Sequence, residues 1–210
     1  GPSFSAGHDL KELKAGRKNT DKGENYFIEI MTKCSKLMQS IVNNPKPVIA
    51  EVAGTATAAG CQLVASCDLA YAGKSARFAT PGVNIGLFCS TPMVALSRNV
   101  PNKNSMEMLL TGELISSEKA EKIGLINKVI DDSNLQSYTL KMALKISKKS
   151  SMTVKIGKKA FYKQVDMTLS EAYDYASKVM VDNMLKVDAE EGIDAFIEKR
   201  NPNWQDKYLL

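Results

Sequence analysis

Apolar residues recur at three- and four-residue steps along several segments, which is the spacing of one face of a helix. The longest such segment is 26–42, and its apolar positions are Phe27, Ile30, Met31, Cys34, Leu37, Met38, Ile41 and Val42. Pro45 follows and predicts the end of this helix, because proline disfavours helical backbone in the residue before it. Further helices are predicted at 59–66, 93–99, 106–110, 117–123, 134–148, 152–163, 169–186 and 189–199.

Short apolar runs between these helices predict strands at 47–53, 69–72, 76–79 and 125–130. Residues 14–25 are polar, include two glycines and predict a loop. Strands alternate with helices up to residue 130, and only helices follow. This order favours an α/β layered core over residues 1–130 and a helical C-terminal region over residues 131–210.

Two stretches of small residues each lead from a predicted strand into a predicted helix. The first is 5–8, which follows Phe4 and precedes a helical pattern that Asp9 is expected to cap. The second is 55–60. The first N–H groups of a helix have no partner within the helix, and small side chains let a ligand approach them. Packing alone would explain one such turn, but two in one chain favour a site for a group that develops negative charge.

Composition and charge narrow the classes of partner. Lys and Arg number 28 against 23 Asp and Glu, a net charge of +5, and the lysines are scattered. Because no basic block or reading motif occurs, nucleic-acid binding is not predicted, whereas a small phosphate-bearing ligand is compatible. The longest apolar run is too short to cross a bilayer. The four cysteines, Cys34, Cys61, Cys67 and Cys89, have no metal-site spacing and are expected to be buried free thiols in a reducing compartment.

Several motifs, in order along nearly the whole chain, resemble those of the crotonase superfamily, the enoyl-CoA hydratase/isomerase family. Residues 4–10 resemble its first oxyanion-hole and CoA-binding turn, and residues 52–68 resemble its second. The remaining matches are Phe78-Ala79-Thr80-Pro81, Gly86-Leu87, Thr111-Gly112-Glu113, Ile115-Ser116, Ala120, Gly124-Leu125, Asn127-Lys128-Val129, Glu191-Gly192 and Phe196-Ile197-Glu198-Lys199-Arg200.

The resemblance implies a crotonase-like ββα spiral core, here lacking the N-terminal strands, and a helical C-terminal region that mediates trimerisation or forms a lid. It implies an acyl-CoA thioester as substrate, coenzyme A entering only as part of it, no other tightly bound cofactor and no metal. The assembly would be a homotrimer or a dimer of trimers. An oxyanion hole would be formed by the backbone N–H groups of His8 and Ala59, with Gln62 beside it. CoA would be bound by Ala6, His8, Leu10, Lys11, Gly60, Phe196 and Lys199.

Two positions depart from the family's hydratases. Those enzymes carry glutamates where this chain has Gln62 and Gly82. Neither residue titrates, so the pair of carboxylates that moves protons in hydration is absent. Gln62 retains hydrogen-bonding groups that can orient a water or a thioester, and Gly82 is expected to leave only space.

Three functions follow from these departures. The first is an acyl-CoA enzyme, a lyase or isomerase, that stabilises a thioester enolate without hydrating it. The alternative is a non-catalytic acyl-CoA-binding or assembly protein. The third is a hydratase with relocated acid and base groups, for which the candidates are His8, Asn84, Cys89, Ser90 and Thr91. The expected compartment is the cytoplasm or the mitochondrial matrix.

Overall fold

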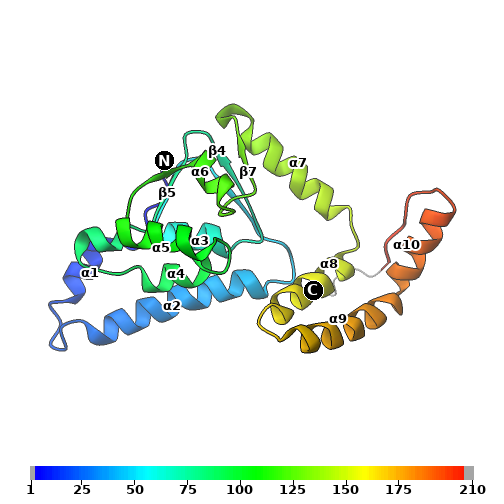
Figure 1. Cartoon of the computed structure of the whole chain (residues 1–210), viewed down its shortest axis with the longest axis horizontal. Helices are drawn as coiled ribbons and strands as arrows, with labels where there is room; N and C mark the ends of the chain where they lie inside the picture. Colours follow the sequence, from blue (N-terminus) through cyan, green and yellow to red (C-terminus); the bar gives the residue numbers. More distant parts are fainter. Residues whose placement is uncertain (1–2, 206–210) are drawn as a thin grey trace. The chain divides into compact units, whose positions relative to one another are not determined.

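The structure is a computed structural model that describes residues 3–205 (Figure 1). The described residues divide into two compact units. Unit 1 contains residues 3–42 and 48–139, and unit 2 contains residues 43–47 and 140–205. Unit 1 holds every strand of the described chain, whereas the regular structure of unit 2 is helical.

Unit 1 contains two sheets. In the first, β1 (Ser3–Ser5), β3 (Thr55–Thr57) and β5 (Arg77–Ala79) are parallel, and β6 (Ile115–Ser116) pairs antiparallel with β5. The second sheet is entirely parallel, in the order β2 (Ile49–Val52), β4 (Leu69–Gly73) and β7 (Lys128–Ile130). The predicted strands are all present within one to three residues of their expected ends.

The helices of unit 1 are α1 (Leu10–Gly16), α2 (Glu24–Asn43), α3 (Ala59–Ser66), α4 (Ser90–Leu96), α5 (Asn102–Thr111) and α6 (Ser117–Lys122), with 3₁₀ turns η1 (Pro81–Ile85) and η2 (Asp132–Asn134). The predicted loop at 14–25 is shorter than expected, because α1 continues to Gly16 and α2 begins at Glu24. Asp9 caps α1 as predicted, since its carboxylate accepts the N–H of Lys11 at 2.7 Å.

Unit 2 is built from α8 (Ser151–Gln164), α9 (Leu169–Met184) and α10 (Val187–Ile197), and α7 (Leu135–Ser147) leads into it from unit 1. The predicted capping box at the start of α9 is confirmed. The Thr168 hydroxyl accepts the N–H of Glu171, and the Glu171 carboxylate accepts the N–H of Thr168 at 3.0 Å. No helix within residues 3–205 is long and apolar enough to span a membrane.

The main core lies in unit 1, between the two sheets and the helices α3 to α6. Its most completely buried members include Val52, Ala56, Val64, Phe78 and Leu96. A second cluster packs Cys34, Met38 and Ile41 of α2 against Ala59 and Leu63 of α3. Helix α3 is therefore held from two sides, by the sheets and by α2, which fixes the position of its N-terminus.

Candidate active site

Three parallel strands of the first sheet end at one edge. Ser5 of β1 pairs with Ala56 of β3, and Thr57 of β3 pairs with Ala79 of β5. The residues that follow these strands are 6–8, 58–59 and 80–82. In open sheets with parallel strands, ligands bind in the crevice beyond the carboxyl ends. The two small-residue turns predicted as a site therefore lie beyond the carboxyl ends of parallel strands, as ligand-binding residues do in such sheets.

The first two turns touch through glycines. Gly7 has φ +90°, and a Cβ atom there would lie 3.1 Å from the Ala59 nitrogen and 3.1 Å from the Ala58 Cβ. A Cβ atom on Gly60 would lie 2.1 Å from the Ser5 carbonyl oxygen, closer than any real contact. The N-terminus of α3 thus sits directly on the end of β1, and only glycine at position 60 allows this approach.

The peptide before α3 has an unusual conformation. Ala58 has φ +51° and ψ −119°, a region that residues with a Cβ rarely adopt. Its N–H continues the pairing with β5 by donating to the Ala79 carbonyl at 3.0 Å, and its carbonyl accepts the N–H of Gln62 at 3.0 Å. The turn at Ala58 therefore ends the strand pairing and starts the helix within a single residue.

In the described part of the chain, several backbone donors lack a partner where the turns meet, and those of His8 and Ala59 are among them. Within residues 3–205 neither the N–H of His8 nor that of Ala59 donates a hydrogen bond. Ala59 is the first residue of α3, where the helix dipole adds partial positive charge. Unpaired N–H groups are normal in the first turn of a helix, and they can bind an anionic ligand that approaches the turn.

The predicted CoA-binding residues fall into two groups. Ala6, His8, Leu10, Lys11 and Gly60 lie on the two turns and the start of α1, and the Leu10 side chain is 56% exposed. Phe196 and Lys199 lie at the end of α10 in unit 2.

Gln62 is buried in the packing between α2 and α3. Its side-chain oxygen accepts the S–H of Cys34 on α2, with a sulfur–oxygen distance of 3.8 Å. Its amide nitrogen donates no hydrogen bond within residues 3–205, which leaves two donors available.

Position 82 is not open space, so that expectation is wrong. A Cβ atom on Gly82 would lie 2.7 Å from the Leu87 carbonyl oxygen and 2.9 Å from the Cys89 sulfur. The N–H of Gly82 donates to this sulfur at 3.3 Å. The segment 82–89 folds tightly onto residue 82, and any side chain there requires this segment to move.

The thiols are free, as predicted, and three of the four are buried, whereas Cys67 is partly exposed. Burial raises the pKa of Cys34 and of Cys89. Burial, and then the neighbouring Cys89, raises the pKa of the Cys61 thiol to about 12. These three side chains are therefore protonated at neutral pH, and none is a thiolate nucleophile.

Two features of the site were not predicted from the sequence. One is the left-handed backbone at Ala58, for which a run of small residues gives no specific signal. The other is the hydroxyl of Thr80, which follows β5 directly, is fully buried and has no hydrogen-bond partner within residues 3–205. Its only sequence signal is its place after a predicted strand and before Pro81.

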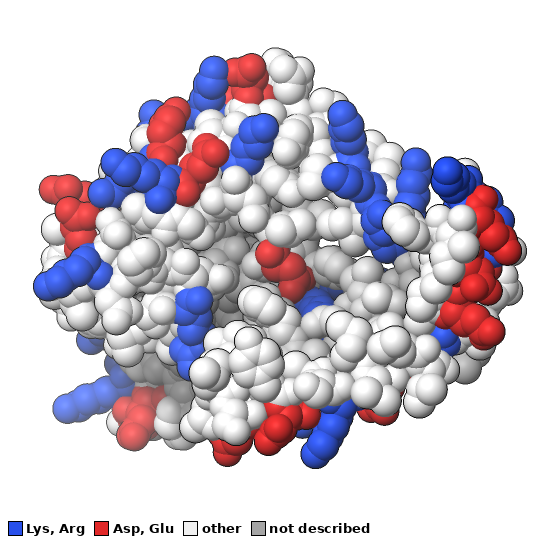
Figure 2. Space-filling view, turned by 45° about the vertical axis from the view of Figure 1, so that its right-hand side comes forward, with Lys and Arg blue, Asp and Glu red and all other residues white. Residues whose placement is uncertain are grey.

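Charged groups are mixed rather than concentrated. On the face shown in Figure 2, Lys and Arg side chains occur among Asp and Glu side chains. Within residues 3–205 there is no group of three or more His, Cys, Asp or Glu side chains that could hold a metal ion.

The sequence and the fold were compared with known proteins. The family model described as "Enoyl-CoA hydratase/isomerase" matches residues 1–207. Enoyl-CoA hydratase domain-containing protein 3, mitochondrial, from Mus musculus is 54% identical over 205 residues, covering 97% of this chain and 66% of the mouse protein. The chain thus spans about two thirds of that relative's length.

Solved structures agree with this assignment. A crystal structure of human enoyl-CoA hydratase domain-containing protein 3 superposes with a TM-score of 0.92 at 53% identity, over 97% of this chain and 79% of the human one. An enoyl-CoA hydratase from Mycobacterium smegmatis gives 0.91 at 46% identity, over 97% and 77% of the two chains. The chain therefore belongs to the enoyl-CoA hydratase/isomerase family, as its motifs predict, and has the α/β crotonase fold with a helical C-terminal region.

Proposed function

We propose that this protein binds an acyl-CoA thioester and stabilises negative charge on the thioester oxygen with the N–H groups of His8 and Ala59. The observation that carries the proposal is that these two donors are unpaired and belong to turns in direct contact. An enolate places its charge on this oxygen, and fixed donors aimed there act without reorganising. Removing one such donor costs about 10²- to 10³-fold in rate in comparable sites.

The reaction we propose is isomerisation, decarboxylation or thioester cleavage rather than hydration. Hydration needs one group to deprotonate a water and another to protonate the α-carbon. The two positions matching the hydratase glutamates are Gln62, whose oxygen is engaged by Cys34, and Gly82, which is closed in by Leu87 and Cys89. The unpaired amide nitrogen of Gln62 is a suitable donor to a thioester or a water.

A non-catalytic acyl-CoA-binding role is the second candidate. It is favoured by the protonated thiols, because Cys61 and Cys89 supply no base or nucleophile beside residue 82. His8 is the one histidine of the sequence, and its side chain is partly exposed. If the protein is an enzyme, this imidazole is the side chain at the two turns that could move a proton.

We assign the two groups of CoA-binding residues to different parts of the ligand. Ala6, Leu10, Lys11 and Gly60 accompany the oxyanion hole and the part of CoA nearest the thioester. Phe196 and Lys199 offer an aromatic face and a cation, which suit the adenine and a phosphate. Coenzyme A enters only as part of the substrate.

We further propose a mitochondrial location and a homotrimer or dimer of trimers. The mouse and human relatives are named mitochondrial. Large apolar side chains are exposed on α9 and α10, among them Leu169 at 77% and Ile197 at 70%, which fits burial by another copy.

Isotope-edited infrared spectroscopy tests the oxyanion hole directly. Full-length protein is mixed with an acyl-CoA carrying ¹³C at the thioester carbonyl. Hydrogen bonds from His8 and Ala59 are expected to lower the carbonyl stretching frequency relative to the ligand in water. Binding without this shift would contradict the proposed stabilisation.

Turnover of a panel of acyl-CoAs then separates the two candidates. We expect crotonyl-CoA hydration to be absent and at least one of isomerisation, decarboxylation or thioester hydrolysis to occur. A lowered carbonyl frequency with no turnover of any substrate would favour the binding protein. Hydration that His8→Ala abolishes would show relocated acid–base groups and refute the proposed reaction class.

A further inference from the structure

The side chain of Gln62 is held at one of its two polar atoms. Gln62 is the fourth residue of α3 and is only 5% exposed. Its amide oxygen accepts the S–H of Cys34, a buried residue of α2, with a sulfur–oxygen distance of 3.8 Å. Burial raises the pKa of the Cys34 thiol, so the sulfur keeps its proton at neutral pH. The thiol therefore acts as a donor, and the amide oxygen is the atom that it holds.

The amide nitrogen of Gln62 is left for a ligand. It has two N–H donors, and no group within residues 3–205 accepts them. An amide that turns freely about its last bond offers either its oxygen or its nitrogen, whereas this amide offers only donors. Helical side chains lean toward the N-terminus of their helix, and residues three apart share a face. The Gln62 amide and the Ala59 N–H therefore lie at the same end of α3.

The sequence around these donors is poor in negative charge. Asp68 is the only acidic residue between positions 52 and 106, and its carboxylate accepts the N–H of Val48 at 2.7 Å. Asp9, which follows His8, is exposed and caps α1. The dipole of α3 adds partial positive charge at its N-terminus. These groups favour a ligand with a second anionic oxygen beside the thioester.

We propose that Cys34 is a positioning residue, which holds the Gln62 oxygen so that the amide NH₂ selects acyl-CoAs with a carboxylate on the carbon next to the thioester carbonyl. This inference rests on the proposed acyl-CoA function. With the thioester oxygen at the N–H groups of His8 and Ala59, a carboxylate on the adjacent carbon lies close to a side chain one helical turn along α3. Without Cys34, the amide could turn its oxygen toward this carboxylate and oppose it.

Two ligands of the same size and branching test this selection. Malonyl-CoA has a carboxylate where isovaleryl-CoA has a carbon with two methyl groups, so the pair differs chiefly in charge. Affinities of the full-length protein for both are measured by calorimetry, and unreacted malonyl-CoA is quantified by chromatography after each titration. We expect the wild type to bind malonyl-CoA about tenfold more tightly, because hydrogen bonds to a charged acceptor are stronger than those to a neutral one.

Substitutions at the two contacting side chains assign this preference. Cys34→Ala removes the donor that holds Gln62, and should reduce the preference to about twofold or less. Cys34→Ser keeps a donor of similar size and should retain it. Gln62→Leu should abolish it, because the amide is gone. If Cys34→Ala does not fold, Cys34→Val, which fills the space without a donor, takes its place.

Ile41→Val is the matched control, because it removes one carbon from the same buried cluster of α2 and no side-chain hydrogen-bonding group. It should leave the preference unchanged. Equal wild-type affinities for the two ligands, or equal losses of both affinities in Cys34→Ala, would overturn the positioning role, as would loss of the preference in Cys34→Ser. Failure of the wild type to bind any acyl-CoA would instead refute the proposed function on which the inference rests. Circular dichroism confirms that each variant is folded.

Discussion

Ala58 is the residue whose conformation creates the proposed oxyanion hole. Its φ of +51° with ψ −119° is a glycine conformation occupied by an alanine. Such strain costs about 1–3 kcal/mol. Glycine would remove the strain at an entropy cost of about 0.5–1 kcal/mol. We therefore predict that Ala58→Gly raises the free energy of unfolding by about 1 kcal/mol, seen as a higher urea midpoint. A lower midpoint would show that this backbone is unstrained.

Gly60 is the residue that lets the two turns meet. Its added Cβ would lie 2.1 Å from the Ser5 carbonyl oxygen, and neither of these backbones yields easily. We predict that Gly60→Ala destabilises the protein by at least about 1–3 kcal/mol and abolishes the lowered thioester carbonyl frequency. Chemical denaturation and the infrared measurement check the two effects.

Gly157 provides the control for this substitution. It lies within α8, and an added Cβ there meets nothing within 4 Å. Gly157→Ala should therefore stabilise the protein by about 0.5–1 kcal/mol. Similar effects at positions 60 and 157 would rule out the close contact with Ser5.

The sequence predicted the two turns of the proposed site better than the surroundings of Gln62 and Gly82. Runs of small residues identify the turns at 5–8 and 55–60, because close backbone approach demands small side chains. The environments of Gln62 and Gly82 depend on residues that only the fold brings near. Cys34 lies 28 positions before Gln62, and the carbonyl that closes off Gly82 belongs to Leu87.

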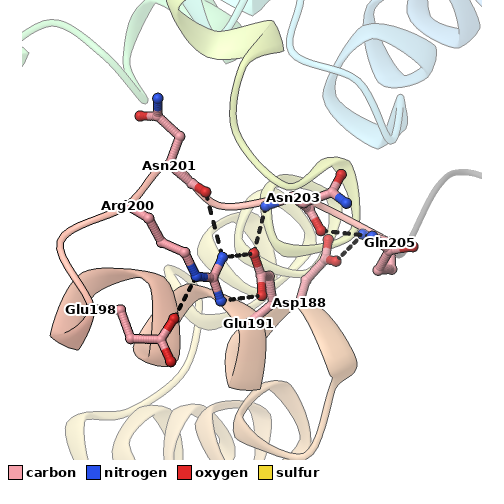
Figure 3. A network of polar contacts seen from close by, with 7 residues as sticks. All are labelled: Asp188, Glu191, Glu198, Arg200, Asn201, Asn203 and Gln205. Atoms are coloured by element: carbon pink, nitrogen blue, oxygen red, sulfur yellow. Dashed lines mark hydrogen bonds and ion pairs between the residues drawn. The ribbon is translucent and has the colours of Figure 1, made fainter.

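At the scale of elements, the apolar pattern decided what could be predicted. The long helices follow from periodic patterns, and β2, β4, β5 and β7 follow from short apolar runs. Strands β3 (Thr-Ala-Thr) and β6 (Ile-Ser) form no apolar run and were not predicted. Residues 200–205 turn back along α10, where the Glu191 carboxylate accepts hydrogen bonds from Arg200 and from the N–H of Asn203 (Figure 3). This turn also had no signal, since such contacts depend on tertiary folding.

The attachment of this segment should depend on pH. The Arg200 hydrogen bonds, followed by the N–H of Asn203, lower the pKa of Glu191 from 4.5 to about 2. A carboxylate with a depressed folded-state pKa stabilises the fold above its unfolded pKa, and this contribution is lost as pH falls. The difference in urea midpoint between wild type and Glu191→Gln should therefore be constant above pH 4.5 and shrink toward pH 2. A difference that does not change across this window would contradict the assignment.

At the scale of the whole molecule, unit 2 presents an apolar stripe on α9. Tyr173, Met180 and Met184 are 68%, 62% and 58% exposed and recur at helical spacing on one face. Exposed apolar surface of this kind is typical of an interface. We expect copies of the chain to bury it in the proposed trimer.

A charge placed on this stripe should break the assembly. We predict that Met180→Glu shifts the full-length protein from an oligomer toward the monomer mass in analytical ultracentrifugation, because the interface would bury an unpaired carboxylate. Lys178→Glu, on the opposite side of α9, should leave the mass unchanged despite its larger change in charge. An unaltered mass for Met180→Glu would place the interface elsewhere.

The two donors of the proposed site belong to the main chain, and this decides which amino-acid changes can remove them. Every residue at positions 8 and 59 except proline supplies the same N–H, so side-chain substitutions at these two positions leave the donors in place. Deleting the donor itself requires an ester in place of the amide at residue 59. Proteins of this fold can therefore differ in their acidic and basic side chains and keep the same two N–H donors, because the donors depend on the path of the backbone.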